Sequence, residues 1–126
     1  MEKQIINTAN APAAIGPYSQ AVGIGNLVFI SGQIPLHPIT GEVILGNIVQ
    51  QTHQVMKNLT AILEAGGSTL SQVVKTTVYL TDLADFAAFN RVYQEYFPQN
   101  PPARATVQVA GLPKGVKIEI EAIAFK

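Results

Sequence analysis

The strongest pattern in the chain is an apolar residue at every third or fourth position after Asn47, which is the spacing of an amphipathic helix. The Asn47 side chain is suited to accept a backbone N–H at the start of this helix, and Gln50 stands where a capping box requires it. Gly66-Gly67 predicts the end of the helix, because glycine tolerates the left-handed backbone conformation that often follows a helix.

A second periodic segment, rich in aromatic residues, predicts another helix. Either Asp82 or Asp85 is suited to cap it, and Pro98 stops it because proline cannot donate the helical hydrogen bond. The apolar side of this helix is predicted to carry Phe86, Phe89, Val92, Tyr93, Tyr96 and Phe97.

Alternating and β-branched stretches predict the strands of a sheet. A hairpin is expected from Tyr18–Ile24 and Leu27–Ile30, with Gly25-Asn26 supplying positive φ angles in the turn. Further strands are predicted at 73–80, 104–110 and 116–125, with a weaker one at 3–7 and a loop or second hairpin at 31–46. The order of elements predicts one α+β domain over residues 1–126, a mixed β-sheet with two helices packed on one face.

Because two helices cover only one face of such a sheet, the other face must meet water or a partner. We expect that face to carry either the set Thr76, Arg104, Thr106 and Glu121 or the residues that alternate with them. Charged residues make up only 13% of the chain, against roughly 25% in an ordinary soluble domain. So few charges favour a partner subunit, and we expect a homo-oligomer.

Composition and charge exclude several classes of function. Lys and Arg balance Asp and Glu at eight each and form no basic run, which argues against dedicated nucleic-acid binding. The absence of cysteine excludes disulfides and zinc–thiolate sites. His37 and His53 are far apart in the sequence, so we expect two surface histidines and no metal site. The chain has no signal-peptide pattern and no membrane-spanning apolar run, so we expect a cytoplasmic protein.

Arg104 is the clearest candidate for chemistry, because it follows two prolines and opens an otherwise neutral strand. Its guanidinium offers a bidentate fork to a carboxylate or phosphate, although the sequence also fits an interface ion pair or a side chain reaching to solvent. Glu121 belongs either to a solvated strand face or, beside an arginine and a water, to a general base. Tyr18 and Ser31 stand at loop-to-strand junctions, where side chains often meet ligands.

Several ordered segments resemble the Rid family of reactive intermediate imine deaminases, also called the YjgF family, and its RidA subgroup most of all. These segments are Ala11–Gln20, Phe29–Pro35, Val74–Val78, Pro102–Val107 and Leu112–Ala124. The resemblance implies a chorismate-mutase-like fold assembled as a homotrimer, with ligand clefts between neighbouring subunits. It also implies hydrolysis of 2-iminobutanoate and 2-iminopropanoate, which pyridoxal-phosphate-dependent dehydratases release, to 2-oxo acids and ammonia without a cofactor.

The resemblance assigns roles to individual residues. Arg104 matches the arginine that binds the substrate carboxylate, and Glu121 matches the late glutamate that activates water. Many relatives carry cysteine in place of Thr106, and arginine is common in place of Gly111. The substrate-binding positions implied by the resemblance are Tyr18, Ser31, Gly32, Asn90, Arg104 and, through its main chain, Thr106.

Other functions stay open at this stage. A non-catalytic regulatory protein that binds 2-oxo acids would need Arg104 and would tolerate loss of Glu121. An endoribonuclease or translation inhibitor, an activity attributed to some family members, is disfavoured by zero net charge and by the lack of a basic patch and of a catalytic histidine pair. The sequence neither supports nor opposes a chaperone-like role.

Overall fold

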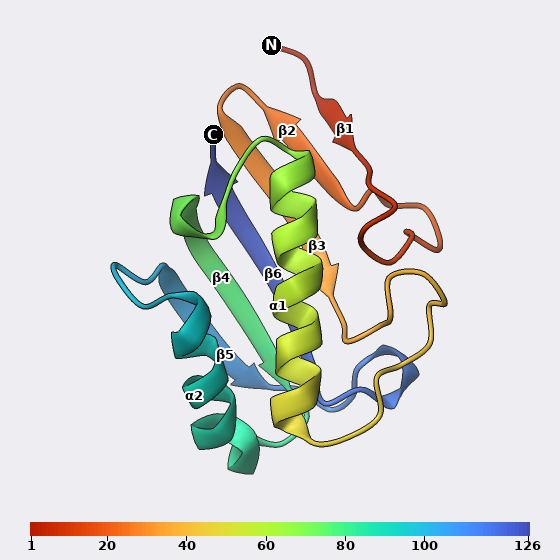
Figure 1. Ribbon diagram of the computed structural model, residues 1–126, viewed down its shortest axis with the longest axis vertical. Coiled ribbons are helices and arrows are strands. Elements are labelled where there is room, and N and C mark those ends of the chain that lie inside the picture. The colour runs from red at the N-terminus through yellow and green to blue at the C-terminus, as the bar shows by residue number, and fades with distance from the viewer.

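The computed structural model describes residues 1–126 as a six-stranded mixed sheet with two α-helices (Figure 1). The strands lie in the order β1-β2-β3-β6-β4-β5, and all neighbours are antiparallel except β4 and β5. The α+β class and the mixed sheet are therefore confirmed. The strands are β1 Gln4–Ile6, β2 Ala21–Ile24, β3 Leu27–Gln33, β4 Val73–Leu80, β5 Ala103–Gln108 and β6 Ile118–Phe125; the helices are α1 Ile48–Ala65 and α2 Phe86–Tyr96.

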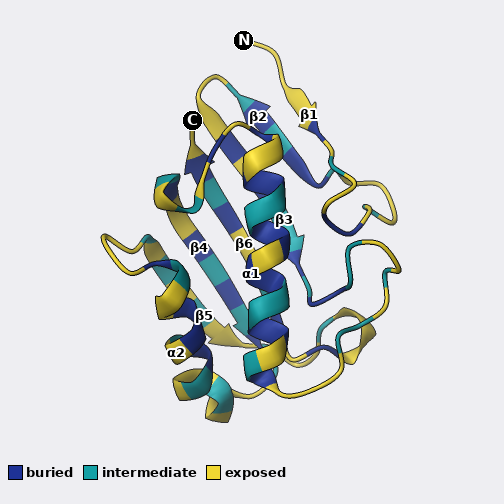
Figure 2. Cartoon of the chain, viewed as in Figure 1, coloured by how far each residue is buried: buried dark blue, intermediate teal, exposed yellow.

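Both helices pack on the same face of the sheet, as predicted. Figure 1 shows α1 crossing the middle of the sheet and α2 beside it, near β4 and β5. Figure 2 shows buried residues alternating with more exposed ones along the central strands, because only one face of the sheet is covered. Neither α1 nor α2 combines the length and the apolar composition of a membrane-spanning helix. Fully buried side chains between the helices and the sheet include Met56, Leu59, Ile62, Phe89, Ile118 and Ile120.

The start of α1 carries the predicted capping box. Asn47 Oδ1 accepts the N–H of Gln50 at 3.1 Å, and Gln50 Oε1 accepts the N–H of Asn47 at 2.9 Å. Asn47→Ala is expected to lower the free energy of unfolding by about 1 kcal/mol, measured by urea denaturation. Asn47→Asp keeps the acceptor and is expected to retain most of the stability; equal losses in both variants would contradict the capping role.

Several predicted boundaries differ from the structure. Residues 18–20 precede β2, and only Gly25 of the hairpin turn has a positive φ, at 57°. β3 runs past Ile30 to Gln33, with an irregular register against β6. The segment that follows was predicted as a loop or a second hairpin, and it is a loop with one isolated bridge, between Leu36 and Val43. β5 ends before the predicted 110, and β6 begins after the predicted 116.

The predicted cap of the second helix belongs to a short turn before it. Asp82 Oδ1 accepts the N–H of Ala84 at 2.9 Å and caps the 3-10 turn Leu83–Asp85. Asp85 makes no capping bond with its side chain, and α2 begins at Phe86. The predicted apolar side of α2 is correct for Phe89, Val92, Tyr93 and Phe97, which are buried, whereas Phe86 stays exposed.

The register separates Glu121 from the other polar residues that were expected to share its face. Thr76 lies opposite Arg104 in β5 and Ala122 in β6, so these residues face the helices. Thr76 is buried there and bonds to Tyr93 Oη at 2.7 Å. Glu121, next to Ala122, faces the uncovered side. The expected grouping is wrong because alternation fixes the faces within a strand, while the phase between strands depends on pairing.

Candidate functional site

Arg104 lies on the edge strand β5, on the face that carries the helices. Its Nη1 donates to Asn90 Oδ1 of α2 at 2.9 Å. The guanidinium carbon also lies 4.9 Å from the ring centroid of Tyr93, 5.4 Å from that of Phe89 and 5.5 Å from that of Phe86. These distances are within the range of cation–π attraction. Asn90 and the rings therefore hold the guanidinium in one position at the edge of the sheet.

The surroundings of Arg104 suit an anion. A guanidinium has five N–H donors, and the Arg104 bond to Asn90 uses one of them. An open pocket of about 500 Å³ adjoins it, lined by both residues and by the Pro101-Pro102 segment. Burial raises the pKa of the neighbouring Tyr93 phenol, against the lowering effects of Thr76 and Arg104, so this hydroxyl stays neutral. The arrangement can bind a carboxylate at the edge of β5.

A second group of site residues surrounds Glu119 on the open side of the sheet. Glu119, Tyr18 and Gly32 line a cavity of about 400 Å³, together with Lys114 and Gln33. Burial, followed by the negative charge of Glu121, raises the pKa of the Glu119 carboxyl. A carboxyl whose pKa is shifted toward neutrality can both take and return a proton, which is the requirement for general acid–base chemistry.

The loop that carries Tyr18 is held in place by one buried side chain. Gln20 Oε1 accepts the N–H of Thr8 at 2.7 Å, and Gln20 Nε2 donates to the carbonyl of Pro12 at 2.8 Å. The two bonds tie Gln20, at the end of the loop, to the beginning of the same loop. Pro12 and Ile15, which lie in this loop, form part of the cavity wall. Tyr18 itself is half exposed at the cavity mouth, where its hydroxyl accepts the N–H of Ile15 at 3.4 Å.

Gly32 packs directly against the Glu119 carboxylate, and a Cβ at this position would overlap its Oε2 atom. Gly32→Ala is therefore expected to push the carboxylate out of place and to lower both activity and stability, the latter by about 1–3 kcal/mol. Thermal melting and turnover of the proposed substrate measure the two losses. Gly111→Ala is the matched control, since no atom lies near its Cβ position; similar losses in both variants would contradict the contact.

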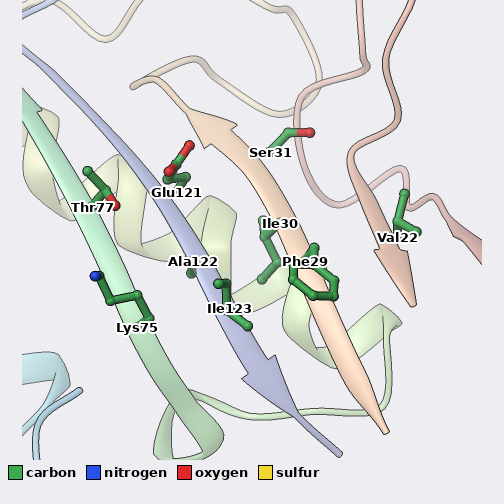
Figure 3. A pocket seen from close by; sticks show the side chains of 9 residues that line it. All are labelled: Val22, Phe29, Ile30, Ser31, Lys75, Thr77, Glu121, Ala122 and Ile123. Atoms are coloured by element: carbon green, nitrogen blue, oxygen red, sulfur yellow. The ribbon is translucent and has the colours of Figure 1, made fainter. Parts of the chain in front are cut away.

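Glu121 and Ser31 line a neighbouring hollow of about 310 Å³ in the open face. Figure 3 shows Glu121 on β6 between Thr77 on β4 and Ser31 on β3. Ser31 Oγ donates to the carbonyl of Ser19 at 2.6 Å, which ties β3 to the Tyr18 loop. The predicted site residues Ser31 and Glu121 are thus close together, but they line a different depression from Tyr18 and Gly32.

Thr106 lies on the helix-facing side of β5, two residues from Arg104 and opposite Val78. Its Oγ1 atom is buried and has no hydrogen-bond partner. A buried hydroxyl without a partner is costly, so this atom is a candidate to bond with a bound molecule or a second chain.

The two histidines lie outside these groups. His53 was expected on the surface, but it is half-buried and its Nδ1 lies 2.7 Å from Tyr96 Oη, a bond that joins α1 to α2. His37 Nδ1 accepts the backbone N–H groups of Ile39 and Thr40. No cluster of side chains suited to a metal ion is present.

Within one chain the predicted residues do not form one site. Arg104 and Asn90 lie on the helix side of the edge strand, whereas Glu119 and Glu121 project from the opposite face of the sheet. A ligand held by the guanidinium cannot reach either carboxylate of the same chain through the sheet. The two halves come together only if the β5 edge of one copy approaches the open face of another.

Comparison with known proteins identifies the family. Residues 8–126 match the family model described as endoribonuclease L-PSP. The human 2-iminobutanoate/2-iminopropanoate deaminase is 49% identical over 98% of this chain and 90% of its own length. The chain belongs to the Rid family. The resemblance seen in the sequence motifs is thereby confirmed.

Two solved Rid structures have the same fold. RidA of an Antarctic Psychrobacter species is 51% identical, with a TM-score of 0.94 over 98% of this chain and 99% of that one. E. coli TdcF, solved with bound serine, is 48% identical, with a TM-score of 0.93 over 98% of both chains. These relatives share the mixed sheet and both helices over almost the full length.

Sequence reasoning missed Glu119 as a candidate in this Rid chain. Glu119 and Glu121 alternate with isoleucine in the same strand, so the pattern around them is nearly the same. The structure distinguishes them, because Glu119 lies against Gly32 and lines the cavity that also contains Tyr18. A signal was present in the sequence, since a glycine inside an otherwise β-forming segment often marks a close approach by another group.

Proposed function

We propose that the protein is a 2-iminobutanoate/2-iminopropanoate deaminase, which hydrolyses 2-imino acids to 2-oxo acids and ammonia. The observation that carries this proposal is the pre-oriented guanidinium of Arg104, in a chain about half identical to a protein named for that activity. The relative solved with bound serine supports a ligand of amino-acid size.

Arg104 binds the substrate carboxylate with its free N–H groups, and this fixes the C=N bond relative to the sheet edge. Glu119 takes a proton from a water molecule as the water oxygen attacks the imine carbon. That proton passes to the imine nitrogen, which gives a carbinolamine with one hydroxyl and one amino group on the same carbon. Glu119 then takes the hydroxyl proton and gives it to the amino nitrogen, so that the C=O bond forms as the C–N bond breaks, and ammonia leaves with the 2-oxo acid. Because imines also hydrolyse in water without an enzyme, orientation and one acid–base group suffice, and no cofactor is required.

The supporting residues take the following roles in this proposal. Tyr18 and Gly32 form the cavity wall beside Glu119, and Ser31 holds the Tyr18 loop. Asn90 orients Arg104, and Thr106 contributes its main chain beside the bound carboxylate. Glu121, the glutamate first predicted as the base, is the alternative to Glu119, since both project from the same face of β6.

A homotrimer with clefts between subunits completes the site. In this assembly Arg104 of one copy meets the Glu119 cavity of the next, so that each ligand contacts two chains. The opposite placement of the two residues within one chain and the uncovered apolar sheet face support this arrangement. A cytoplasmic location, close to the dehydratases that release such imines, is part of the same proposal.

The family description gives reason to test a second function, endoribonuclease activity. Neither histidine is placed for it: His53 is bonded to Tyr96 between the helices, and the Nδ1 atom of His37 is engaged by its own loop. With zero net charge, the chain also lacks the cationic excess typical of RNA-binding proteins. RNA cleavage that persists in an Arg104→Ala/Glu119→Gln double variant would indicate a contaminating nuclease.

Competition with a chemical trap tests the proposed hydrolysis directly. A threonine dehydratase generates 2-iminobutanoate, semicarbazide traps the free imine, and the protein is added in catalytic amounts. We expect the protein to reduce semicarbazone formation and to release 2-oxobutanoate in its place. If trapping is unchanged even at stoichiometric protein, hydrolysis of this substrate is ruled out. Affinity for 2-oxobutanoate without turnover would then identify a non-catalytic binding protein.

A further inference from the structure

Tyr79 lies on the open face of the sheet, beside both glutamates of β6. In the ladder between β4 and β6, Tyr79 stands directly opposite Glu119, and Thr77 stands opposite Glu121. Tyr79 is therefore the direct cross-strand neighbour of one carboxylate and the diagonal neighbour of the other. Both positions are within reach of an aromatic side chain. The proposed hydrolysis assigns no role to this half-buried phenol.

The Tyr79 hydroxyl is suited to donate a hydrogen bond to a carboxylate. Burial raises the pKa of the Tyr79 phenol, and the negative charge of Glu121, the contact of the phenol with that carboxylate and the charge of Glu119 raise it further. The phenol therefore keeps its proton at neutral pH. Because an ionised carboxylate only accepts hydrogen bonds, the phenol is the donor in its contact with Glu121.

Few other charged groups surround the two carboxylates. The residues of β3 and β5 on the open face are uncharged. Each of the two depressions holds one lysine, a third lysine precedes β6, and a second phenol lies at the cavity mouth: Lys75, Lys114, Lys117 and Tyr18. Tyr79 differs from these groups because the register places it next to both carboxylates. Tyr79 also lines neither depression, so its hydroxyl acts through a glutamate and not on a substrate.

We propose that Tyr79 is a positioning residue, whose hydroxyl donates to the Glu121 carboxylate and thereby keeps on Glu119 the proton that the reaction exchanges. The inference rests on the proposed function, because it takes Glu119 as the acid–base group. Two neighbouring carboxylates compete for one proton, since a proton on either relieves the repulsion between them. A hydrogen bond donated to one carboxylate favours its ionised form, so the proton goes to the other.

The location of the proton matters for the reaction. Glu119 lies against Gly32 in the cavity that also contains Tyr18, whereas Glu121 lines the neighbouring hollow (Figure 3). A proton on Glu121 would be in the wrong depression. It would also remove the negative charge that, after burial, raises the pKa of Glu119, and Glu119 would become a weaker base.

Tyr79→Phe tests this role, because it removes the hydroxyl and keeps the ring. Carbon-13 NMR of the glutamate carboxyl groups follows proton uptake at each residue, and Glu119→Gln and Glu121→Gln assign the two signals. As the pH of the assembled wild-type protein is lowered, we expect the first proton of the pair to move the Glu119 signal alone. In Tyr79→Phe we expect both signals to move in that first step, the Glu119 signal by only about half of its wild-type change.

The kinetics of Tyr79→Phe give a second readout. Its profile of kcat against pH is expected to show two acidic steps in place of one, because Glu119 becomes a weaker base whenever Glu121 holds the proton. KM is expected to be unchanged, since Tyr79 lines neither depression. Far-UV circular dichroism checks that the variant is folded.

Tyr96→Phe is the matched control, because it also removes a phenol hydroxyl but lies on α2, where it bonds to His53 on the helix side of the sheet. It is expected to titrate as wild type. A first step confined to Glu119 in Tyr79→Phe, or one already shared by both signals in wild type, would overturn the positioning role and leave the proposed hydrolysis standing. A wild-type protein that does not divert 2-iminobutanoate from semicarbazide would overturn the hydrolysis, and the role of Tyr79 with it, whatever the titration shows.

Discussion

Replacing Arg104 with alanine is expected to lower kcat/KM for 2-iminobutanoate at least a hundredfold, which corresponds to about 3 kcal/mol of transition-state stabilisation. Hydrogen bonds to charged groups contribute about 1.5–3 kcal/mol each, and a guanidinium can make two of them to one carboxylate. Asn90 and the Tyr93 ring already hold the guanidinium in place, so the wild-type protein needs little rearrangement on binding. Steady-state kinetics in the semicarbazide assay measure the loss.

Two further variants show whether the loss comes from the geometry of the guanidinium. Arg104→Lys keeps the charge but loses the planar fork, and it is expected to recover only a small part of the activity. Arg91→Ala removes an exposed arginine from the same region of α2 and is expected to behave as wild type. If Arg104→Ala retained wild-type kinetics, the substrate carboxylate would have to be bound by another group.

The sequence predicted best those parts of the fold whose causes are local. The α1 helix was placed correctly because its start and its end depend on nearby residues alone. Asn47 and Gln50 cap the first turn, and the glycines follow the last one. The capping aspartate of the second helix was ambiguous for the same reason, since Asp82 and Asp85 are both good caps and only the backbone path assigns Asp82 to a separate turn. Strand ends differed because pairing partners, which are distant in sequence, determine where a ladder stops.

The candidate site was harder to predict because it depends on the phase between strands. The Arg104 side chain could be predicted to bind an anion from its own chemistry, but its neighbours Asn90 and Tyr93 come from another element. Glu119 and Glu121 have almost the same sequence context, and only the irregular pairing of β3 with β6 brings Gly32 against Glu119. The way in which copies assemble could not be predicted from the sequence, because alternation indicates an uncovered face but does not show which groups a second copy presents to it.

Glu119→Gln is expected to lower kcat for imine hydrolysis by about 10²–10⁴-fold with little change in KM. Glutamine keeps the size of the side chain and its contact with Gly32 but cannot take a proton from water. Glu64→Gln, at an exposed position on α1, is the matched control and is expected to have wild-type kinetics. A Glu119→Gln variant with full activity would return the role of base to Glu121.

The pH dependence separates the two glutamates more sharply. Burial and the charge of Glu121 raise the pKa of Glu119, so the ionised base forms at higher pH than in an ordinary glutamate, and activity is expected to fall as the pH drops through that raised pKa. Glu121→Gln removes the neighbouring negative charge, which lowers the pKa of Glu119 and moves the acidic limb of the profile to lower pH. The comparison requires protein concentrations at which wild type and Glu121→Gln are both assembled.

Protein stability gives a readout of the same carboxyl that does not depend on turnover. Because the folded-state pKa of Glu119 is raised, the protonated form stabilises the fold at low pH and this contribution is lost as the pH rises through the folded pKa. Glutamine resembles the protonated form at every pH, so Glu119→Gln is expected to melt above wild type at neutral pH and to match it in acid. A carboxyl that is kept for catalysis at the expense of stability gives this result. Equal melting temperatures of Glu119→Gln and wild type at neutral pH would mean that Glu119 ionises in the folded protein at no cost in stability. Its pKa would then not be raised for the role of the base.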